Sequence, residues 1–277
     1  MFTLNCKGRL LTLDRPLVMG ILNLTPDSFY SGSRMDSLDR VLEKAGQMLE
    51  QGATILDIGG QSTRPGSERI DAEEEIIRIL EPLRQIRKRF QDAFISVDTY
   101  YSQVARAAAE AGADIINDIS AGSLDPLMIP TVASLKIPYV LMHMKGTPSN
   151  MKQEAVYQDV TREVFDFLSF KMAELTKAGI RDIIIDPGFG FSKTIDHNFE
   201  MLKNLEVFKL LGAPLLLGLS RKSMIYRTLG ISAEEALNGS AVLHTIGLEK
   251  GADIIRTHDV KETMEAILLL EAIRQKK

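Results

Sequence analysis

The feature that most constrains the fold is a series of eight short apolar runs, each ending on a polar residue or on a turn that carries one. The runs are VMGILN (18–23), TILDIGG (54–60), FISVDT (94–99), DIIND (114–118), YVLMHM (139–144), DIIIDPG (182–188), PLLLGLS (214–220) and DIIRTH (253–258). Strands of a closed parallel barrel are buried on both faces, so they are apolar throughout instead of alternating. We therefore predict an α/β fold, a (β/α)₈ barrel.

The length of the chain agrees with this fold. It has 277 residues, and a (β/α)₈ barrel takes about 250 as one unit, so we expect one domain over residues 1–277. The structural competitor is a doubly wound open sheet. A Gly-x-Gly-x-x-Gly motif after the first strand would favour it, and the run at 18–23 is not followed by one.

Helical patterns alternate with the apolar runs. They cover residues 37–51, 72–90, 101–111, 153–178, 196–211, 233–250 and 260–275. Ser37 is the expected cap of the first, and Pro82 predicts a kink or break in the second. Residues 2–6 and 9–13 flank Lys7-Gly8 and predict an N-terminal hairpin that closes the bottom of the barrel.

Composition excludes several classes of protein. A net charge of −4 gives no support for a nucleic-acid binder, which usually has a basic face. The apolar stretches are too short to span a membrane, and MFTLNCKGRL lacks the apolar region of a signal peptide. Cys6 is the only cysteine, so no intrachain disulfide can form, and we expect a cytoplasmic protein.

Barrel enzymes carry their chemistry at the C-terminal ends of the strands. Asp98, Asn117 and Asp186 close three different runs, and charged residues rarely end buried strands without a partner. Together they predict an acceptor-rich pocket for a heterocycle with several N–H donors.

Other strand ends allow two interpretations. Asn23 is either a turn residue or a ligand of a hard cation. Asp57 is either an interior carboxylate paired with a neighbour or a site residue. His143, between two methionines, is better interpreted as a core or supporting residue than as a metal ligand.

Basic residues follow the last two runs. Ser220-Arg221-Lys222-Ser223 and Arg256-Thr257-His258 stand where barrel enzymes frequently bind phosphate. Arg64, in a loop bounded by glycine and proline, is a further anion contact. A flat ligand could meet an apolar wall made of Met142, Met144, Met151, Phe189 and Phe191, although the methionines are ordinarily core residues.

These residues belong to motifs that strongly resemble dihydropteroate synthase of folate biosynthesis. The motifs are MGILNLTPDSF (19–29), DIGGQSTRPG (57–66), SVDTY (96–100), NDIS (117–120), MHMKGTP (142–148), DPGFGFSKT (186–194), GLSRKS (218–223) and IRTHDV (255–260). The resemblance implies a (β/α)₈ barrel that condenses 6-hydroxymethyl-7,8-dihydropterin pyrophosphate with p-aminobenzoate, releasing pyrophosphate by an SN1-like substitution. It also implies Mg²⁺ as cofactor, inhibition by sulfonamides and a homodimer.

The resemblance further implies a role for each site residue. The catalytic residues would be Asp98, Asp186, Lys222 and Arg256. The pterin would contact these four together with Asn117 and Met142. Asn23 would hold the metal, and the pyrophosphate would meet Asn23, Arg64, Arg256 and His258. The p-aminobenzoate would lie among Phe29, Thr63, Arg64, Pro65, Phe191, Lys222 and Ser223.

Three other functions remain open from the sequence. A pterin-binding methyltransferase of the same superfamily would keep the acidic pocket but would not need the two basic motifs. A catalytically silent pterin-binding protein would have lost Asn23, Lys222 or Arg256, and all three are present. An unrelated aldolase barrel would use a Schiff-base lysine, for which Lys222 is the candidate.

Overall fold

The computed structural model describes residues 1–24, 34–61 and 69–275, and within them a parallel eight-stranded sheet is the central element. The strands are β3 (Leu17–Asn23), β4 (Ile55–Gly59), β5 (Phe94–Asp98), β6 (Ile115–Asp118), β7 (Tyr139–Met142), β8 (Ile183–Asp186), β9 (Leu216–Leu217) and β10 (Ile254–Thr257). They run in the order β8-β7-β6-β5-β4-β3-β10-β9. A parallel bridge between Ile185 and Leu215 brings the two edges together, so the predicted barrel is confirmed.

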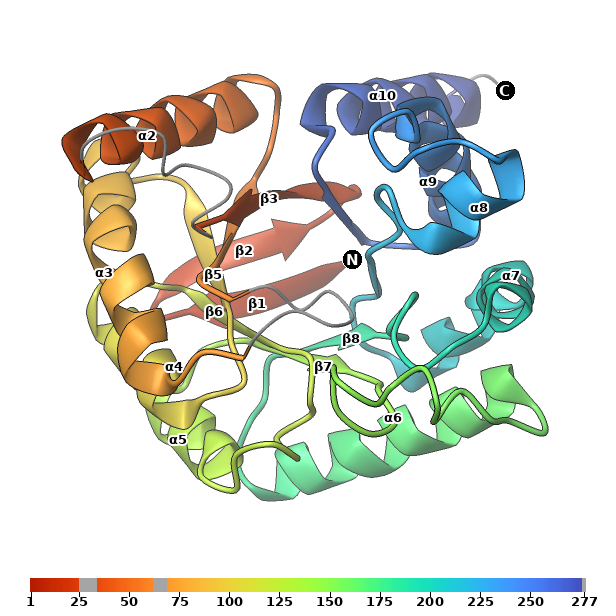
Figure 1. Cartoon of the computed structure of the whole chain (residues 1–277), viewed down its shortest axis with the longest axis horizontal. Helices are drawn as coiled ribbons and strands as arrows, with labels where there is room; N and C mark the ends of the chain where they lie inside the picture. Colours follow the sequence, from red (N-terminus) through yellow and green to blue (C-terminus); the bar gives the residue numbers. More distant parts are fainter. Residues whose placement is uncertain (25–33, 62–68, 276–277) are drawn as a thin grey trace.

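Helices surround the strands as an outer layer (Figure 1). They are α2 (Arg34–Glu50), α3 (Ala72–Arg89), α4 (Ser102–Glu110), α5 (Met128–Leu135), α6 (Val160–Lys177), α7 (Ile195–Lys203), the 3₁₀ helix η1 (Leu205–Leu211), α8 (Ser223–Leu229), α9 (Leu237–Glu249) and α10 (Val260–Gln275). Their inner faces and the outward side chains of the strands form the main apolar core. None of the helices in the described residues is long and apolar enough to span a membrane.

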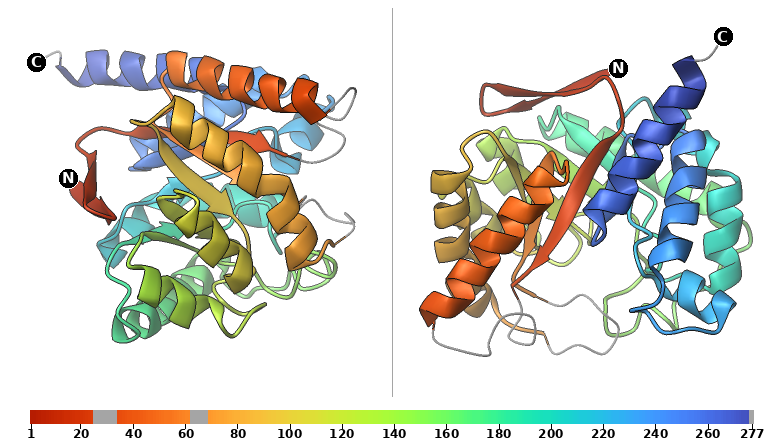
Figure 2. Two further views of the ribbon diagram at one scale, coloured as in Figure 1. Left: turned by 90° about the vertical axis from the view of Figure 1, so that its left-hand side faces the viewer. Right: turned by 90° about the horizontal axis from the view of Figure 1, so that it is seen from above.

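The predicted hairpin closes one end of the barrel. Strands β1 (Phe2–Cys6) and β2 (Arg9–Leu13) pair in antiparallel fashion around Lys7 and Gly8, and the hairpin lies across one end of the molecule (Figure 2). Its buried side chains Leu4, Cys6, Leu11 and Leu13 pack in one cluster with Met19, Ile55, Ile115, Val140, Ile184, Leu216 and Ile254 of the barrel strands. This apolar end is the N-terminal end of the strands, so the opposite end is left for the site.

Three helix boundaries differ from the prediction. Helix α2 begins at Arg34, so Ser37 lies inside it and is not its cap. Helix α6 begins only at Val160, because Asp159 caps it by accepting from the Arg162 N–H. The pattern at 196–211 is two elements, since α7 ends at Lys203 and a 3₁₀ helix follows after Asn204.

Two further differences from the prediction concern α3 and α5. Pro82 does not break α3, which continues to Arg89 with Ile79, Leu83 and Ile86 packed into the core on either side of the proline. Helix α5 was not predicted. It has eight residues, no side-chain cap and no charged residue in its first or last turn, so the usual signals of a helix end are missing.

Candidate functional site

The predicted polar residues gather at the C-terminal ends of the strands, at the mouth of the barrel. Asn23, Asp98 and Asp186 are the last residues of β3, β5 and β8. In the sheet register Asp98 lies beside Asn117, and Met142 lies beside Asp186. Parallel alignment therefore brings these side chains to one edge, as the barrel prediction required.

Arg256, in β10, joins two carboxylates of the mouth. Its Nε donates to Asp57 Oδ2 at 2.6 Å, and its Nη2 donates to Asp98 Oδ2 at 2.8 Å. Asn117 Nδ2 donates to the same oxygen of Asp57 at 3.1 Å. Four residues from four strands thus form one hydrogen-bonded network.

Asp57 is the residue whose importance the sequence left undecided. It is fully buried and paired with Arg256, so the interpretation as a paired interior carboxylate is correct, and the pair belongs to the mouth itself. Its second oxygen, Oδ1, is buried and has no hydrogen-bond partner among the described residues. Buried polar atoms normally have partners, so this oxygen is an acceptor available to a donor that enters the mouth.

Burial dominates the ionisation of the acidic residues. It raises the pKa of Asp98 to about 7, against the lowering effect of Arg256, and Asp57 raises it further. Burial also raises the pKa of Asp186, while Lys222 lowers it. The mouth therefore holds one carboxyl group, Asp98, that changes protonation near neutral pH and a second, Asp186, whose pKa is shifted in the same direction, and such shifts are common at functional sites.

Lys222, in the segment between β9 and α8, projects toward the loop that follows β8. Its Nζ donates to the Phe189 carbonyl and lies 4.8 Å from the centre of the Phe191 ring. Burial lowers the pKa of Lys222 to about 8, and Asp186 opposes this effect. The predicted Lys222, Asp186 and Phe191 therefore share one side of the mouth.

Asn23 faces Asp98 across a glycine. A Cβ atom on Gly59 would lie 3.7 Å from Asn23 Oδ1 and 4.0 Å from Asp98 Oδ2, so the missing side chain leaves space between them. Within the described residues no group of three His, Cys, Asp or Glu side chains is arranged to hold a metal ion. A single amide oxygen still fits Mg²⁺, which commonly keeps water and phosphate oxygens and uses one or two protein ligands.

The residues of the two basic motifs have different hydrogen-bond partners. His258 Nδ1 lies 3.0 Å from Ser220 Oγ, and its backbone N–H donates to the same hydroxyl at 3.1 Å, so β9 and β10 present these groups together. Arg221 instead makes two hydrogen bonds to Asp259, at 2.7 and 3.0 Å. Its charge is already paired, so Arg221 supports the loop and is not directed at an anion.

The residues of the predicted apolar wall lie in two different places. Met142 belongs to a buried cluster with Tyr100 and Ile119, and Phe191 and Met144 pack against that cluster. Phe189, by contrast, is fully buried in the main core, and Met151 is also buried. The ring of Phe189 is a core residue, and its backbone carbonyl is what reaches the mouth.

Four predicted residues cannot be placed. Phe29, Thr63, Arg64 and Pro65 lie outside the described residues. Ser223 is the first residue of α8, directly after Lys222, and is partly exposed. The p-aminobenzoate region is therefore described only at Phe191, Lys222 and Ser223.

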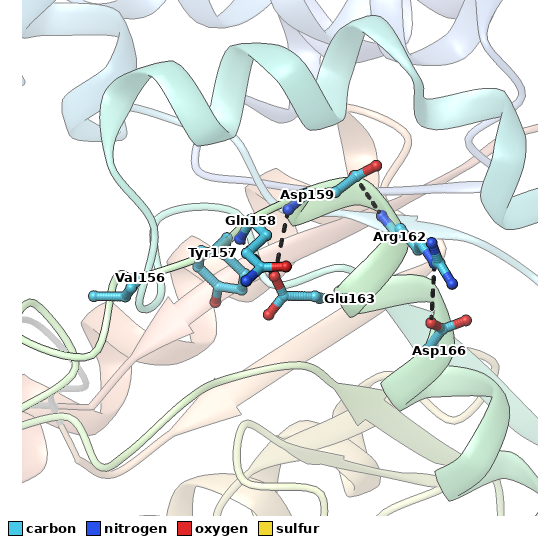
Figure 3. A pocket seen from close by; sticks show the side chains of 7 residues that line it. All are labelled: Val156, Tyr157, Gln158, Asp159, Arg162, Glu163 and Asp166. Atoms are coloured by element: carbon cyan, nitrogen blue, oxygen red, sulfur yellow. Dashed lines mark hydrogen bonds and ion pairs between the residues drawn. The ribbon is translucent and has the colours of Figure 1, made fainter.

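A separate hollow of about 520 Å³ lies beside the N-terminus of α6 (Figure 3). Its lining residues are Val156, Tyr157, Gln158, Asp159, Arg162, Glu163 and Asp166. The polar groups bond to one another, as Arg162 does to Asp166 at 3.7 Å and as the Gln158 N–H does to Glu163 at 2.7 Å. No residue of the mouth lines it, so we do not assign the hollow to the site.

Comparison with known proteins decides the family. The model of the family described as "Pterin binding enzyme" matches residues 19–258. The chain belongs to the pterin-binding enzyme family. It is 44% identical over 268 residues to the dihydropteroate synthase of Escherichia coli K12, covering 96% of this chain and 94% of that protein.

Two solved structures of dihydropteroate synthases match this chain over nearly its full length. The Yersinia pestis dihydropteroate synthase, in a sulfonamide drug complex, is 41% identical with a TM-score of 0.92, covering 99% of both chains. The Xanthomonas albilineans enzyme in complex with 7,8-dihydropteroate is 37% identical with a TM-score of 0.90, covering 99% of this chain and 100% of that one. The predicted activity, dihydropteroate synthase, is thereby confirmed.

Proposed function

We propose that this pterin-binding enzyme uses the mouth network to condense 6-hydroxymethyl-7,8-dihydropterin pyrophosphate with p-aminobenzoate. The observation that carries the assignment of residues is the cluster of Asp57, Asp98, Asn117 and Asp186 around Arg256, with Lys222 beside Asp186. Arg256 holds two of these carboxylates in place, so their free oxygens are oriented before a ligand arrives.

The pterin binds on the acidic side of the mouth. Its ring edge offers several N–H donors, which match the oxygens of Asp98, Asn117 and Asp186. The unpartnered Oδ1 of Asp57 adds one more acceptor. Met142 and the aliphatic part of Lys222 cover the ring, and the Lys222 ammonium donates to an acceptor on it.

The pyrophosphate binds on the basic side. Asn23, Arg256 and His258 lie at the ends of β3 and β10, and Arg64 is proposed to join them from outside the described residues. Asn23 would hold Mg²⁺, which when bound neutralises the charge that develops on the leaving pyrophosphate. Arg256 and His258 stabilise the same charge from the protein side.

The reaction needs no protein nucleophile. The C–O bond to pyrophosphate breaks first, and the cation that forms at the methylene is shared by the pterin ring. Asp98 and Asp186 stabilise this cation electrostatically. The amine of p-aminobenzoate, held near Phe191, Lys222 and Ser223 and by the predicted Phe29, Thr63 and Pro65, then attacks the methylene and loses one proton.

We also propose a homodimer formed by the helices that close the barrel. Several large apolar side chains are exposed on α9 and α10: Leu237, Val242, Ile246, Leu268, Leu269 and Ile273. Scattered exposed apolar residues are normal, but two neighbouring helices that carry six of them favour an interface. Sedimentation velocity of the wild type and of Leu269→Glu tests this proposal, and a wild type that sediments as a monomer would contradict it.

The test of the function is product formation. The protein is incubated with the dihydropterin pyrophosphate, p-aminobenzoate and Mg²⁺, and released pyrophosphate and 7,8-dihydropteroate are measured together. We expect equal amounts of the two products, and competition by a sulfonamide against p-aminobenzoate. Binding of the pterin without release of pyrophosphate would contradict the assignment.

A further inference from the structure

A second lysine, Lys193, lies behind the loop that carries Phe189 and Phe191. It is 9% exposed, and its Nζ lies 2.9 Å from His143 Nδ1 and 3.0 Å from the carbonyl oxygens of Gly188 and Phe191. The His143 carbonyl is a fourth acceptor at 3.4 Å. Among the ion pairs of the described residues none involves Lys193, so its hydrogen-bond partners are neutral groups. Burial lowers the pKa of Lys193 well below the usual value of a lysine, and the charge of Asp186 opposes this effect.

The contact between Lys193 and His143 joins two buried groups. The Lys193 Nζ lies within hydrogen-bond distance of the His143 Nδ1 atom, and one of the two nitrogens supplies the hydrogen. Burial lowers the pKa of His143 to about 2, and the charge of Lys193 lowers it further. His143 is therefore neutral at physiological pH and acts as an anchor for Lys193 at the end of β7.

The loop itself is packed closely on that anchor. Gly188 has φ +72°, and a Cβ atom there would lie 2.0 Å from the His143 carbonyl oxygen, so no side chain fits. Lys193 reaches back under its own loop and bonds the carbonyls at both ends of the segment Gly188–Phe191. The side chain thus links the loop after β8 to the end of β7.

The opposite side of this loop faces the mouth. The Gly188 N–H donates to Asp186 Oδ1 at 2.7 Å, and the Phe189 carbonyl accepts from Lys222. The Phe191 ring lies beneath the same ammonium. One loop therefore contacts two groups of the proposed reaction, Asp186 and Lys222, on its front and Lys193 on its back.

We infer that Lys193 is a positioning residue of the enzyme. By fixing the Gly188–Phe191 segment against His143, it sets the places of the Phe189 carbonyl and the Phe191 ring, and through them the place of Lys222. This inference rests on the proposed function, because it concerns the p-aminobenzoate and pterin contacts assigned to Phe191 and Lys222.

Lys193→Met removes the three donors and keeps the length of the side chain. We expect kcat/KM for p-aminobenzoate to fall roughly ten- to hundredfold, the size of loss that a displacement of about 1 Å in a site produces. KM for p-aminobenzoate should rise. A purely structural defect would instead reduce the amount of active enzyme and leave KM unchanged. Lys203→Met, at an exposed position of α7, is the control and should match the wild type.

Imidazole ¹⁵N NMR of His143 in the wild type tests the contact without any variant. We expect a neutral imidazole ring across the physiological pH range, and a doubly protonated ring would overturn the inference. Wild-type kinetics in the Lys193→Met protein would overturn it as well. If that variant does not fold, the NMR result decides alone. Failure of the proposed function would show differently, as absence of pyrophosphate release by the wild type itself.

Discussion

The two ends of the barrel each contain a buried arginine–carboxylate network, and the two networks are built differently. At the bottom, Arg87 pairs with Asp114, and its other N–H groups donate to the carbonyls of Gly112, Gln91 and Ala93. The Ile95 N–H donates to Asp114 as well. At the mouth, Arg256 holds Asp57 and Asp98, and within the part of the chain that the structure describes Asp57 Oδ1 has no hydrogen-bond partner.

The difference shows how a structural ion pair can be told from a site. The bottom network joins chain segments that must stay together, and backbone carbonyls and an N–H complete it. The mouth network places several carboxyl groups near one another and leaves one of their acceptors open, and burial raises the pKa values of Asp98 and Asp186. Such incomplete satisfaction lowers stability, and at the mouth its persistence is explained by a ligand that completes it.

The largest expected effects come from the two arginines. Arg256→Met should lower kcat/KM by roughly 10²- to 10³-fold, as the loss of one group that stabilises developing charge does, while circular dichroism shows a retained fold. Arg87→Met should lower the free energy of unfolding by about 3–5 kcal/mol, since it leaves a buried carboxylate unpaired, with kcat/KM at 25 °C unchanged. An equal loss of kcat/KM in the two variants would contradict the distinction between a catalytic network at the mouth and a structural network at the bottom.

The next effect concerns the apolar plug of the bottom end. Leu11→Ala should lower the free energy of unfolding by about 2–5 kcal/mol, the usual result of truncating a buried leucine, because Leu11 is 2% exposed within the hairpin cluster. Leu10→Ala changes its neighbour in the same strand, which is 64% exposed. Urea denaturation should show a change below about 0.5 kcal/mol for this control, and a similar loss in both variants would contradict the plug.

A smaller effect concerns Glu75, a buried acid near Asp98. Burial raises its pKa to about 8 from 4.5, and Asp98 raises it further. The folded state therefore holds a proton that the unfolded state has released, so stability falls as pH rises from about 4.5 to 8. Glu75→Gln removes this dependence.

Urea denaturation of the wild type and of Glu75→Gln from pH 5 to pH 9 measures this pH dependence of stability. The free energy of unfolding of the variant minus that of the wild type should be about 1–3 kcal/mol larger at pH 8 than at pH 5, because a pKa change of one corresponds to about 1.4 kcal/mol. A difference that stays constant with pH would show that Glu75 is ionised in the folded protein throughout.

The strands could be predicted because burial on both faces leaves a direct mark on each segment. Seven of the eight apolar runs contain one whole strand of the barrel, and the run at 18–23 contains all of β3 except its first residue, Leu17. Even the two-residue strand β9 lies inside its run at 214–220. Helix ends were less predictable. Ser37 has the composition of a cap, but α2 continues past it to Arg34, since composition cannot show where the preceding chain turns.

The site residues could be predicted as a group but not as a network. Asp98, Asn117 and Asp186 end their strands, so the barrel rule places them together. The pairing of Arg256 with Asp57 links residues 199 positions apart and depends on the register of β10, β3 and β4. The contact of Lys193 with His143 depends on a loop reversal at Gly188, which no spacing in the sequence reveals.

Binding of the pterin substrate to two matched variants tests the central claim most directly. Asp186→Asn and Asp114→Asn each neutralise a buried carboxyl group, one at the mouth and one at the bottom of the barrel. Isothermal titration with the dihydropterin pyrophosphate should show an affinity at least roughly tenfold weaker for Asp186→Asn, as expected for a lost charge-assisted hydrogen bond. Asp114→Asn should bind as the wild type does. Wild-type affinity in Asp186→Asn, or an equal loss in both variants, would contradict the assignment of the mouth as the pterin site.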